Sequence, residues 1–325
     1  MSVLESYLHP SHRPYILVVG DVMLDEYVYC DVVGQSPEDE VALKLRPVRR
    51  EWKGGGALNV ALNLATLAAD VVLVGRVGSD ASRKILQDIL TSTQIFKNVQ
   101  FLEVVSPDCP TTKKTRYITN KQHRHVVRID DECMHSDDEA RILEEIECSR
   151  GTFNRVIVSD YGKGVVTPGV IKLIQKMMGT AFIVDPKSKD FMSYGLAEAI
   201  TPNELEYAAA KPGYFNKPKF EGATIIETCS AGGARIHMRA TGDINQHNVT
   251  HQQLVRAREV GDPAGCGDSF IATFAYARSV GATIGQATAL GCAAGACAYD
   301  HVGVHNVTKE ELAKELTTFP YGGEA

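Results

Sequence analysis

Short apolar runs recur along this chain, and stretches of helical pattern separate them. The first run, Tyr15–Gly20, is continuously apolar and ends in Gly-Asp, a pattern typical of a strand that is buried on both faces. Further strands are predicted at 71–74, 156–159, 182–184, 199–201 and 224–227. Helices are predicted at 57–69, 82–91, 136–148, 167–178 and 204–210. This alternation predicts an α/β fold with a mostly parallel central sheet, in which ligands bind beyond the carboxyl ends of the strands.

Two segments break the alternation, at approximately residues 27–53 and 110–129. Both are rich in β-forming residues with polar alternation, as in Val41–Arg46 and Thr115–Thr119. We expect them to form the antiparallel strands of a small β lid that is inserted into the α/β body. The chain of 325 residues has no long linker and no internal repeat, so we expect residues 1–325 to form a single domain that includes this lid.

The lid segments carry an excess of basic residues although the whole chain is acidic. The net charge is −6, which argues against nucleic acid as a partner. Residues 111–129 nevertheless contain no acid, and their cations are Lys113, Lys114, Arg116, Lys121, Arg124 and Arg128. A locally basic lid on an acidic protein favours a small anionic substrate. A basic face that is simply solvated explains the composition equally well.

The eight cysteines show no C-x-x-C spacing and are scattered through apolar stretches. We therefore expect buried free thiols in a reducing environment. Residues 1–14 lack the apolar core of a signal peptide, and no apolar run approaches the roughly 18 to 20 residues of a membrane-spanning helix. These features predict a cytoplasmic protein without a membrane partner.

The stretch Val260–Phe270 places three glycines and a proline directly before an alanine-rich helix predicted at 269–279. The backbone N–H groups of Gly265, Cys266 and Gly267 would then lie at a helix N-terminus, where amides and the helix dipole bind anions. Asp268 in the same turn is placed to accept a proton from an attacking hydroxyl. An N-capped helix without a ligand explains the same pattern. Two common nucleotide cradles, the Walker A sequence and a G-x-G-x-x-G after the first strand, are absent.

A second glycine-rich stretch, KGGGALNVA at 53–61, also precedes a predicted helix. Gly55 and Gly56 let the backbone approach a ligand closely, and Asn59 can donate and accept hydrogen bonds. Asp21 and Asp25 follow the first strand, where carboxylates suit bidentate contacts to sugar hydroxyls. A flexible loop with a helix cap, and ordinary turn carboxylates, are the alternatives for these residues.

Three further side chains are candidate ligands. Lys163, in the DYGKG stretch at 160–164, is either a phosphate contact or a loop lysine. His301 and His305 stand four residues apart, but no helical pattern and no third ligand accompanies them in the sequence. We therefore expect no metal site at these histidines.

Taken together, these stretches resemble the ribokinase-like (PfkB) carbohydrate kinase family. GGGALNVA matches its N-terminal signature, DPAGCGDSF matches its C-terminal signature, and Asn203–Glu206 matches its N-x-x-E motif. The resemblance implies a three-layer α/β sandwich with a small β lid, and ATP and Mg²⁺ as cofactors. It implies that Asp268 is the catalytic base and that the amides of residues 265–267 hold the transferred phosphoryl group.

The same resemblance implies the nucleotide and metal contacts. Asn203 and Glu206 organise magnesium, Glu206 through a water molecule, and the remaining nucleotide contacts are Lys187, Thr228, Ser230 and Gly233. A monovalent cation, K⁺, is implied beside Asp262, although Pro263 lacks the hydroxyl and the N–H of the usual threonine. Family lids often pair across a dimer, so a homodimer through the lid is expected.

Within that family the sequence most resembles the kinases of heptose 7-phosphate, through VVGDVMLDEY at 18–27, Ser36-Pro-Glu and Val184-Asp-Pro-Lys. Such an enzyme phosphorylates the C1 hydroxyl of the phosphosugar. The implied substrate contacts are Asp21, Asp25, Gly55, Gly56, Asn59, Lys114, Arg116, Arg128 and Lys163. Where these kinases usually have Ala-Pro-Val, this chain has Asp39-Glu-Val. The alternatives are a kinase for ribose, fructose or a nucleoside, a non-catalytic sugar or nucleotide sensor, and a polyanion-binding protein.

Overall fold

The computed structural model describes residues 3–39, 41–133, 137–149, 151–210, 223–240, 243–247 and 261–318. Within these residues a nine-stranded sheet has the order β13-β12-β11-β10-β9-β8-β1-β4-β5. Neighbouring strands are parallel from β11 through β5, and the β11–β12 and β12–β13 pairs are antiparallel. The strand bounds are β1 Tyr15–Gly20, β4 Asp70–Gly78, β5 Val99–Ser106, β8 Arg155–Ser159, β9 Phe182–Asp185, β10 Ala199–Ile200, β11 Thr224–Thr228, β12 Ala234–Ala240 and β13 Asp243–His247.

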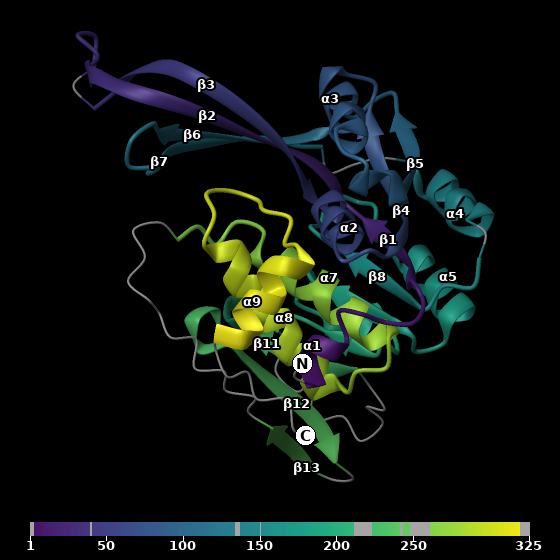
Figure 1. Ribbon diagram of the computed structural model, residues 1–325. Coiled ribbons are helices and arrows are strands. Elements are labelled where there is room, and N and C mark those ends of the chain that lie inside the picture. Colours follow the sequence, from purple (N-terminus) through teal and green to yellow (C-terminus); the bar gives the residue numbers. More distant parts are fainter. Residues whose placement is uncertain are drawn as a thin grey trace.

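Helices cover both faces of this sheet, as Figure 1 shows. One face packs against α1 Val3–Ser6, α2 Ala57–Thr66, α3 Ala81–Thr91, α7 Cys266–Ser279, α8 Ile284–Tyr299 and α9 Lys309–Thr318. The other packs against α4 Glu139–Cys148, α5 Pro168–Met178 and α6 Glu204–Ala209. Short 3₁₀ helices lie at Ile95–Asn98, Phe191–Tyr194 and Ser230–Gly232. The predicted three-layer α/β sandwich is thereby confirmed.

The position of the first strand in the sheet explains why its sequence is apolar throughout. In β1, Ile16 and Val18 point into the core on the α2 and α7 side, whereas Leu17 and Val19 point into the core on the α4 and α5 side. All four side chains are fully buried. A strand with a helical layer on each face needs apolar residues at every position, not at alternate ones.

The predicted lid is a separate four-stranded sheet with the order β3-β2-β6-β7. Its strands are β2 Val22–Gln35, β3 Leu43–Gly56, β6 Thr112–Thr119 and β7 His125–Asp131, and the long β2–β3 ribbon projects from the body (Figure 1). The β2–β3 and β6–β7 pairs are antiparallel as expected. The central pair, β2–β6, is parallel, because both strands begin at the body and run outward.

The cysteine prediction is wrong in one respect. Cys109 and Cys133 form a disulfide, with their Cα atoms 5.6 Å apart, which is an ordinary separation for this bond. The bond ties the segment before β6 to the segment after β7, so it closes the base of that hairpin. The two residues are 24 apart in sequence and show no spacing motif, so the pairing was not visible there. Cysteine usage therefore no longer indicates a reducing environment.

None of the described helices is long and apolar enough to cross a membrane.

Candidate active site

The carboxyl ends of the central strands carry the polar residues that the sequence singled out. β1 lies between β4 and β8, so the chain leaves β1 at the point where the strand order reverses, which is where ligands bind in sheets of this type. Asp21 follows β1, Asp160 follows β8, and Asp185 is the last residue of β9. The geometry thus brings three carboxylates to one edge of the sheet.

The turn before α7 has the geometry expected for an anion-binding helix N-terminus. Gly265 is the N-cap residue and adopts the left-handed conformation, with φ at 81°. A Cβ atom at Gly265 would lie 3.0 Å from the side-chain nitrogen of Asn59, whereas one at Gly267 would meet open space. The N–H of Cys266 donates within the turn, to the carbonyl of Pro263 at 3.3 Å. Contact of these amides with a phosphoryl group stays a prediction.

Asp268 lies in the first turn of α7 and is only 5% exposed. One carboxylate oxygen accepts a hydrogen bond from Asn59 Nδ2 at 2.7 Å, and the other accepts one from the hydroxyl of Tyr161 at 2.6 Å. Burial raises the pKa of Asp268 to about 6, although both hydrogen bonds lower it. A carboxylate whose pKa lies close to neutral pH suits a general base.

Asn59 and Tyr161 hold the carboxylate of Asp268 in place. The side-chain oxygen of Asn59 accepts from Asn306 at 2.9 Å and from Asn63 at 3.1 Å, so the amide orientation is fixed from three sides. The predicted sugar contact of Asn59 therefore stays a prediction, and positioning of Asp268 is the role that its contacts support. Tyr161 was not predicted as a site residue from the sequence, although it lies in the DYGKG stretch at 160–164 that contains the candidate Lys163.

Asp21 has partners other than the predicted sugar. Its carboxylate accepts the backbone N–H groups of Tyr161 at 2.8 Å, Lys163 at 3.0 Å and Val165 at 3.2 Å. Burial raises the pKa of Asp21 above its ordinary value. The carboxylate thus holds the loop that carries Tyr161, and its contact with a sugar hydroxyl stays a prediction. Gly56 is required nearby, because a Cβ there would lie 2.4 Å from the carbonyl oxygen of Asp21.

Asp25 and Arg116 form an ion pair at the base of the lid, where their side chains are 5% and 11% exposed. The second oxygen of Asp25 lies against Gly55, where a Cβ would approach it to 2.0 Å. The Arg116 guanidinium also lies 5.3 Å from the centre of the Tyr27 ring. Arg116 was predicted to grip a phosphate, but in this structure Asp25 is its partner.

The other predicted phosphate contacts occupy different depths of the lid. Lys114 lies 5.1 Å from the centre of the Tyr161 ring, close enough to Asp268 to influence the pKa of that carboxyl. Burial lowers the pKa of Lys114 below its ordinary value. Arg128 is 56% exposed and pairs with Asp130 at 2.8 Å, and Lys163 pairs with Glu132. Lys114 is therefore the predicted phosphate contact nearest to the base.

The N-x-x-E motif has a structural role in the fold. Asn203 and Glu206 form a capping box at the start of α6, with reciprocal bonds of 2.9 Å and 3.1 Å. The second oxygen of Glu206 lies 3.7 Å from Lys187 Nζ. The predicted nucleotide turn is adjacent, because Thr228 at the end of β11 donates its N–H to the carbonyl of Pro202. Ser230 and Gly233 follow in that turn, both with positive φ.

Asp185 was not among the predicted site residues, although it lies in the Val184-Asp-Pro-Lys stretch that resembles the kinases of heptose 7-phosphate. Burial, together with the charges of Asp268, Glu206 and Asp160, raises its pKa well above the ordinary value. Asp185 thus lies close enough to Asp268 and Glu206 for their charges to influence its pKa. Grouped carboxylates of this kind are stabilised by a cation, and oxygen ligands suit magnesium.

Asp262 was predicted to contact a monovalent cation. One of its oxygens accepts the N–H of Ala264 at 3.0 Å, and the other accepts the N–H of Gly303 at 2.8 Å. The second oxygen also lies 3.5 Å from Nε2 of His125 on the lid. These contacts join the α7 turn, the 303 loop and the lid, and the cation stays a prediction.

The fold and this arrangement define a class, the nucleotide-dependent sugar kinases with a ribokinase-like fold. The family model for "pfkB family carbohydrate kinase" matches residues 13–311. The chain belongs to this family.

Curated relatives include two proteins named "Bifunctional protein HldE". The one from Gluconobacter oxydans is 35% identical over 313 residues, and the one from Granulibacter bethesdensis is 35% identical over 319 residues. Each alignment covers 93% of this chain and 64% of the relative. The chain therefore spans just under two thirds of the length of these relatives.

Solved structures agree on the fold. Phosphofructokinase-2 from Escherichia coli, in complex with potassium, matches with a TM-score of 0.72 at 18% identity, over 94% of this chain and 98% of that chain. Ribokinase from Arabidopsis thaliana, complexed with ribose and ATP, matches with a TM-score of 0.67 at 18% identity, over 94% and 99%. At this identity the similarity concerns the fold alone.

Proposed function

We propose that this kinase transfers the γ-phosphoryl group of ATP to the C1 hydroxyl of a heptose 7-phosphate, giving the 1,7-bisphosphate. Such a product is a precursor of the activated heptose that is used for bacterial surface polysaccharide. Two observations support this acceptor: the similarity to HldE proteins along most of the chain, and the basic residues of the lid. Because the reaction consumes ATP, a cytoplasmic location is part of the proposal.

The observation that carries the chemistry is the buried Asp268 at the N-terminus of α7. Its carboxylate takes the proton of the sugar hydroxyl as that oxygen forms a bond to the γ-phosphorus, and the bond from phosphorus to the bridging oxygen of ADP breaks. Amides of residues 265–267 face the charge that develops on the transferred group. Asn59 and Tyr161 keep the carboxylate in position by hydrogen bonds of 2.7 Å and 2.6 Å.

Magnesium fits the group of carboxylates next to this base. Glu206, Asn203 and Asp185 would hold it, directly or through water, because all three offer oxygen atoms near the predicted phosphate position. Bound there, the ion supplies positive charge for the phosphates of ATP. The raised pKa of Asp185 supports this assignment, since neighbouring carboxylates disfavour its ionisation in the absence of a cation.

The proposal is tested with purified enzyme, ATP, magnesium and a panel of acceptors, scored by the release of ADP. The panel contains heptose 7-phosphate, the same heptose without phosphate, ribose, fructose and a nucleoside. We expect kcat/KM for the phosphosugar to exceed that for its unphosphorylated partner at least tenfold. A preference for any unphosphorylated acceptor would contradict the proposed substrate. ATP turnover by none of them would favour a sugar or nucleotide sensor.

One observation favours a second candidate, a kinase for an unphosphorylated sugar. Asp25 already binds Arg116, which neutralises one of the cations assigned to the distal phosphate. Ribose, fructose or a nucleoside needs no such cation. The panel separates this candidate from the first, because it contains the heptose with and without its phosphate beside unphosphorylated ribose, fructose and a nucleoside.

We also propose that the protein is a homodimer joined through the lid. Large apolar side chains are exposed on these strands, namely Val32, Val33, Leu43, Val48, Trp52, Val127 and Ile129. The strands β3 and β7 are unpaired edges of the lid sheet within the described residues. A second copy of the chain would cover both features.

A further inference from the structure

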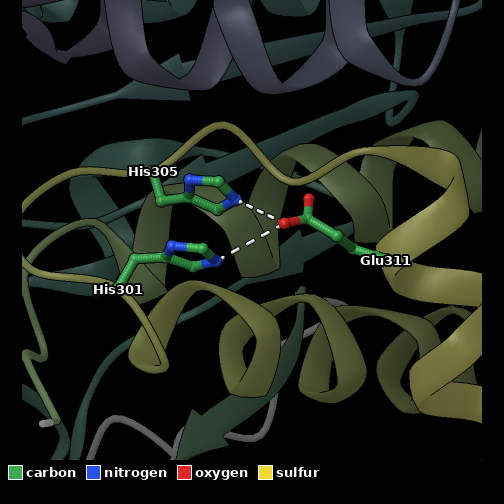
Figure 2. Close-up of side chains that lie close together, drawn as sticks. All are labelled: His301, His305 and Glu311. Carbon is green, nitrogen blue, oxygen red and sulfur yellow. Dashed lines mark hydrogen bonds and ion pairs between the residues drawn. The ribbon is translucent and has the colours of Figure 1, made fainter.

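Two histidines and a glutamate converge near the C-terminal end of the described chain, outside the site just described. Figure 2 shows His301 and His305 with their imidazole rings side by side and both Nε2 atoms directed at Glu311. The Nε2 atom of His305 lies 2.9 Å from Oε1 of Glu311, and that of His301 lies 3.4 Å from the same oxygen. All three potential ligand atoms lie within 4.8 Å of one another. No third ligand for this histidine pair is apparent from the sequence, and the fold brings Glu311 to it from the first turn of α9.

The carboxylate of Glu311 is held in a fixed orientation. Its other oxygen, Oε2, accepts the backbone N–H of Thr308 at 2.8 Å and the hydroxyl of Thr308 at 3.0 Å. These bonds leave Oε1 facing the two imidazoles. Hydrogen bonds of this kind are the usual means by which proteins orient a metal-binding carboxylate.

The two imidazoles are also arranged in parallel. Their ring centres lie 3.5 Å apart with an angle of 13° between the planes, which places both Nε2 atoms on the same side. Stacked rings that share one acceptor oxygen cannot both be charged without repulsion. The neutral imidazole is the form of histidine that binds metals.

From this geometry we infer a binding site for one divalent metal ion of the zinc class, held by Nε2 of His301, Nε2 of His305 and Oε1 of Glu311. Two imidazole nitrogens and one carboxylate oxygen are ligands typical of zinc. With bonds of about 2.0 to 2.2 Å, tetrahedral ligand atoms lie roughly 3.3 to 3.5 Å apart. The His301 contact already has this length. The His305 contact needs to lengthen by about half an ångström, and the two rings need to open from their stacked arrangement so that both Nε2 lone pairs point at the ion.

The site is accessible from solvent. The side chains of His301, His305 and Glu311 are 43%, 23% and 34% exposed. A metal ion can therefore enter, and a water molecule can take the fourth position. Another group of this kind among the described residues, Glu204, Glu227 and Cys229, is less suitable, because Glu227 already pairs with Arg235 and His237.

The loop from His301 to Asn306 connects this site to Asp268. Gly303 donates to Asp262, and the carbonyl of Val304 accepts from Lys53 at 2.7 Å. Asn306 donates to Asn59, which in turn donates to Asp268. A metal ion bound by His301, His305 and Glu311 would fix both ends of this loop and so stabilise the position of Asn59.

The test measures metal binding directly, without ATP or sugar, so its result does not depend on the proposed function. The purified chain is stripped with a chelator and titrated with Zn²⁺ in competition with a chromophoric chelator. Glu311→Gln, His301→Ala and His305→Ala are the test variants. Glu310→Gln is the matched control, because Glu310 is exposed, neighbours Glu311 in the same helical turn and lies outside the cluster. Far-UV circular dichroism of every variant confirms that it is folded.

We expect the wild type and Glu310→Gln to bind one equivalent of zinc with the same affinity. Each test variant should bind it at least about a hundredfold more weakly, since loss of even an orienting partner commonly weakens metal binding ten- to a hundredfold. The thiols of the chain are the same in all variants. The difference in zinc affinity between Glu311→Gln and Glu310→Gln therefore measures the contribution of the cluster alone. Equal affinity of these two variants, or no bound equivalent in the wild type, overturns the proposal and leaves a hydrogen-bonded His-Glu-His cluster.

Discussion

At the scale of single residues, the state of Asp268 depends on a balance between burial and two hydrogen bonds. Burial raises the pKa of its carboxyl to about 6, and donation from Asn59 and Tyr161 limits the rise. The base is active only when ionised. We therefore expect kcat to fall about tenfold for each pH unit below roughly 6 and to be level above it until another group titrates.

This dependence is measured as a pH–rate profile at saturating ATP and sugar. Tyr161→Phe supplies the control, because it removes one of the two hydrogen bonds that lower the pKa. Its profile should shift to higher pH while the wild-type profile stays near 6. Identical profiles for the two proteins would show that a different group limits the rate.

A second prediction concerns the identity of the base. Asp268→Asn keeps the size of the side chain but removes its ability to accept a proton. We expect kcat to fall by roughly two to four orders of magnitude, the range of general-base contributions, with ATP affinity largely unchanged. Steady-state kinetics and equilibrium ATP binding measure the two quantities. A near-normal kcat in this variant would refute the assignment.

The sequence predicted the residues of the site better than their roles. Asp268 and the turn before it were visible because they sit in one short motif. Tyr161 was missed because it is 107 positions from Asp268, and only the fold brings its hydroxyl to the carboxylate. Asn59, Asp21 and Arg116 were assigned to substrate, but each has protein partners that only tertiary contacts reveal.

At the scale of elements, the lid carries the cations that we propose to contact the phosphate of the acceptor. Arg116 is an unsuitable test residue, because its removal would leave Asp25 buried without its partner and would destabilise the protein. Arg128 is exposed and pairs only peripherally with Asp130, so its side chain can reorient toward a ligand. Lys114 lies deeper, beside Tyr161.

We expect Arg128→Ala and Lys114→Ala each to raise KM for the phosphosugar by about ten- to a hundredfold, the value of a charge-assisted contact of roughly 1.5 to 3 kcal/mol. KM for ATP should hardly change in Arg128→Ala, and the effect should vanish with the unphosphorylated sugar. Arg124→Ala, an exposed cation on the same hairpin, is the control. Less than a twofold change in both test variants would remove the support for a phosphorylated acceptor.

Sequence patterns identified most elements of the body, because buried strands and amphipathic helices have distinct periodicities. They missed β5, β12 and β13, which lie toward the edges of the sheet and lack a continuous apolar run. They also missed the helices α1, α8 and α9. The parallel pairing of β2 with β6 was also not predictable. It depends on where two segments 89 residues apart leave the body, as in Met23 opposite Thr112, and alternation within a strand does not report its partner.

At the scale of the whole molecule, the layered body was predictable, because each layer follows from local sequence patterns. Which surfaces stay exposed, and what would cover them, was not predictable. The lid projects from the body (Figure 1). Apolar side chains are exposed on its strands β2, β3 and β7. Trp52 on β3 is 44% exposed and is the only tryptophan of the chain. Its fluorescence therefore reports on the lid alone.

If the lids of two copies cover each other, light scattering at micromolar concentration should give twice the chain mass of 35.4 kDa. Dilution should shift the emission of Trp52 to longer wavelength as its indole becomes hydrated. Val127→Glu places a charge on the exposed apolar part of β7 and should yield a monomer, because burial of an unpaired charge is costly. Met177→Glu, on the exposed surface of α5, should remain dimeric. A wild-type monomer whose emission does not change with concentration would mean that the lid works uncovered, and its apolar side chains would then be available to a different partner.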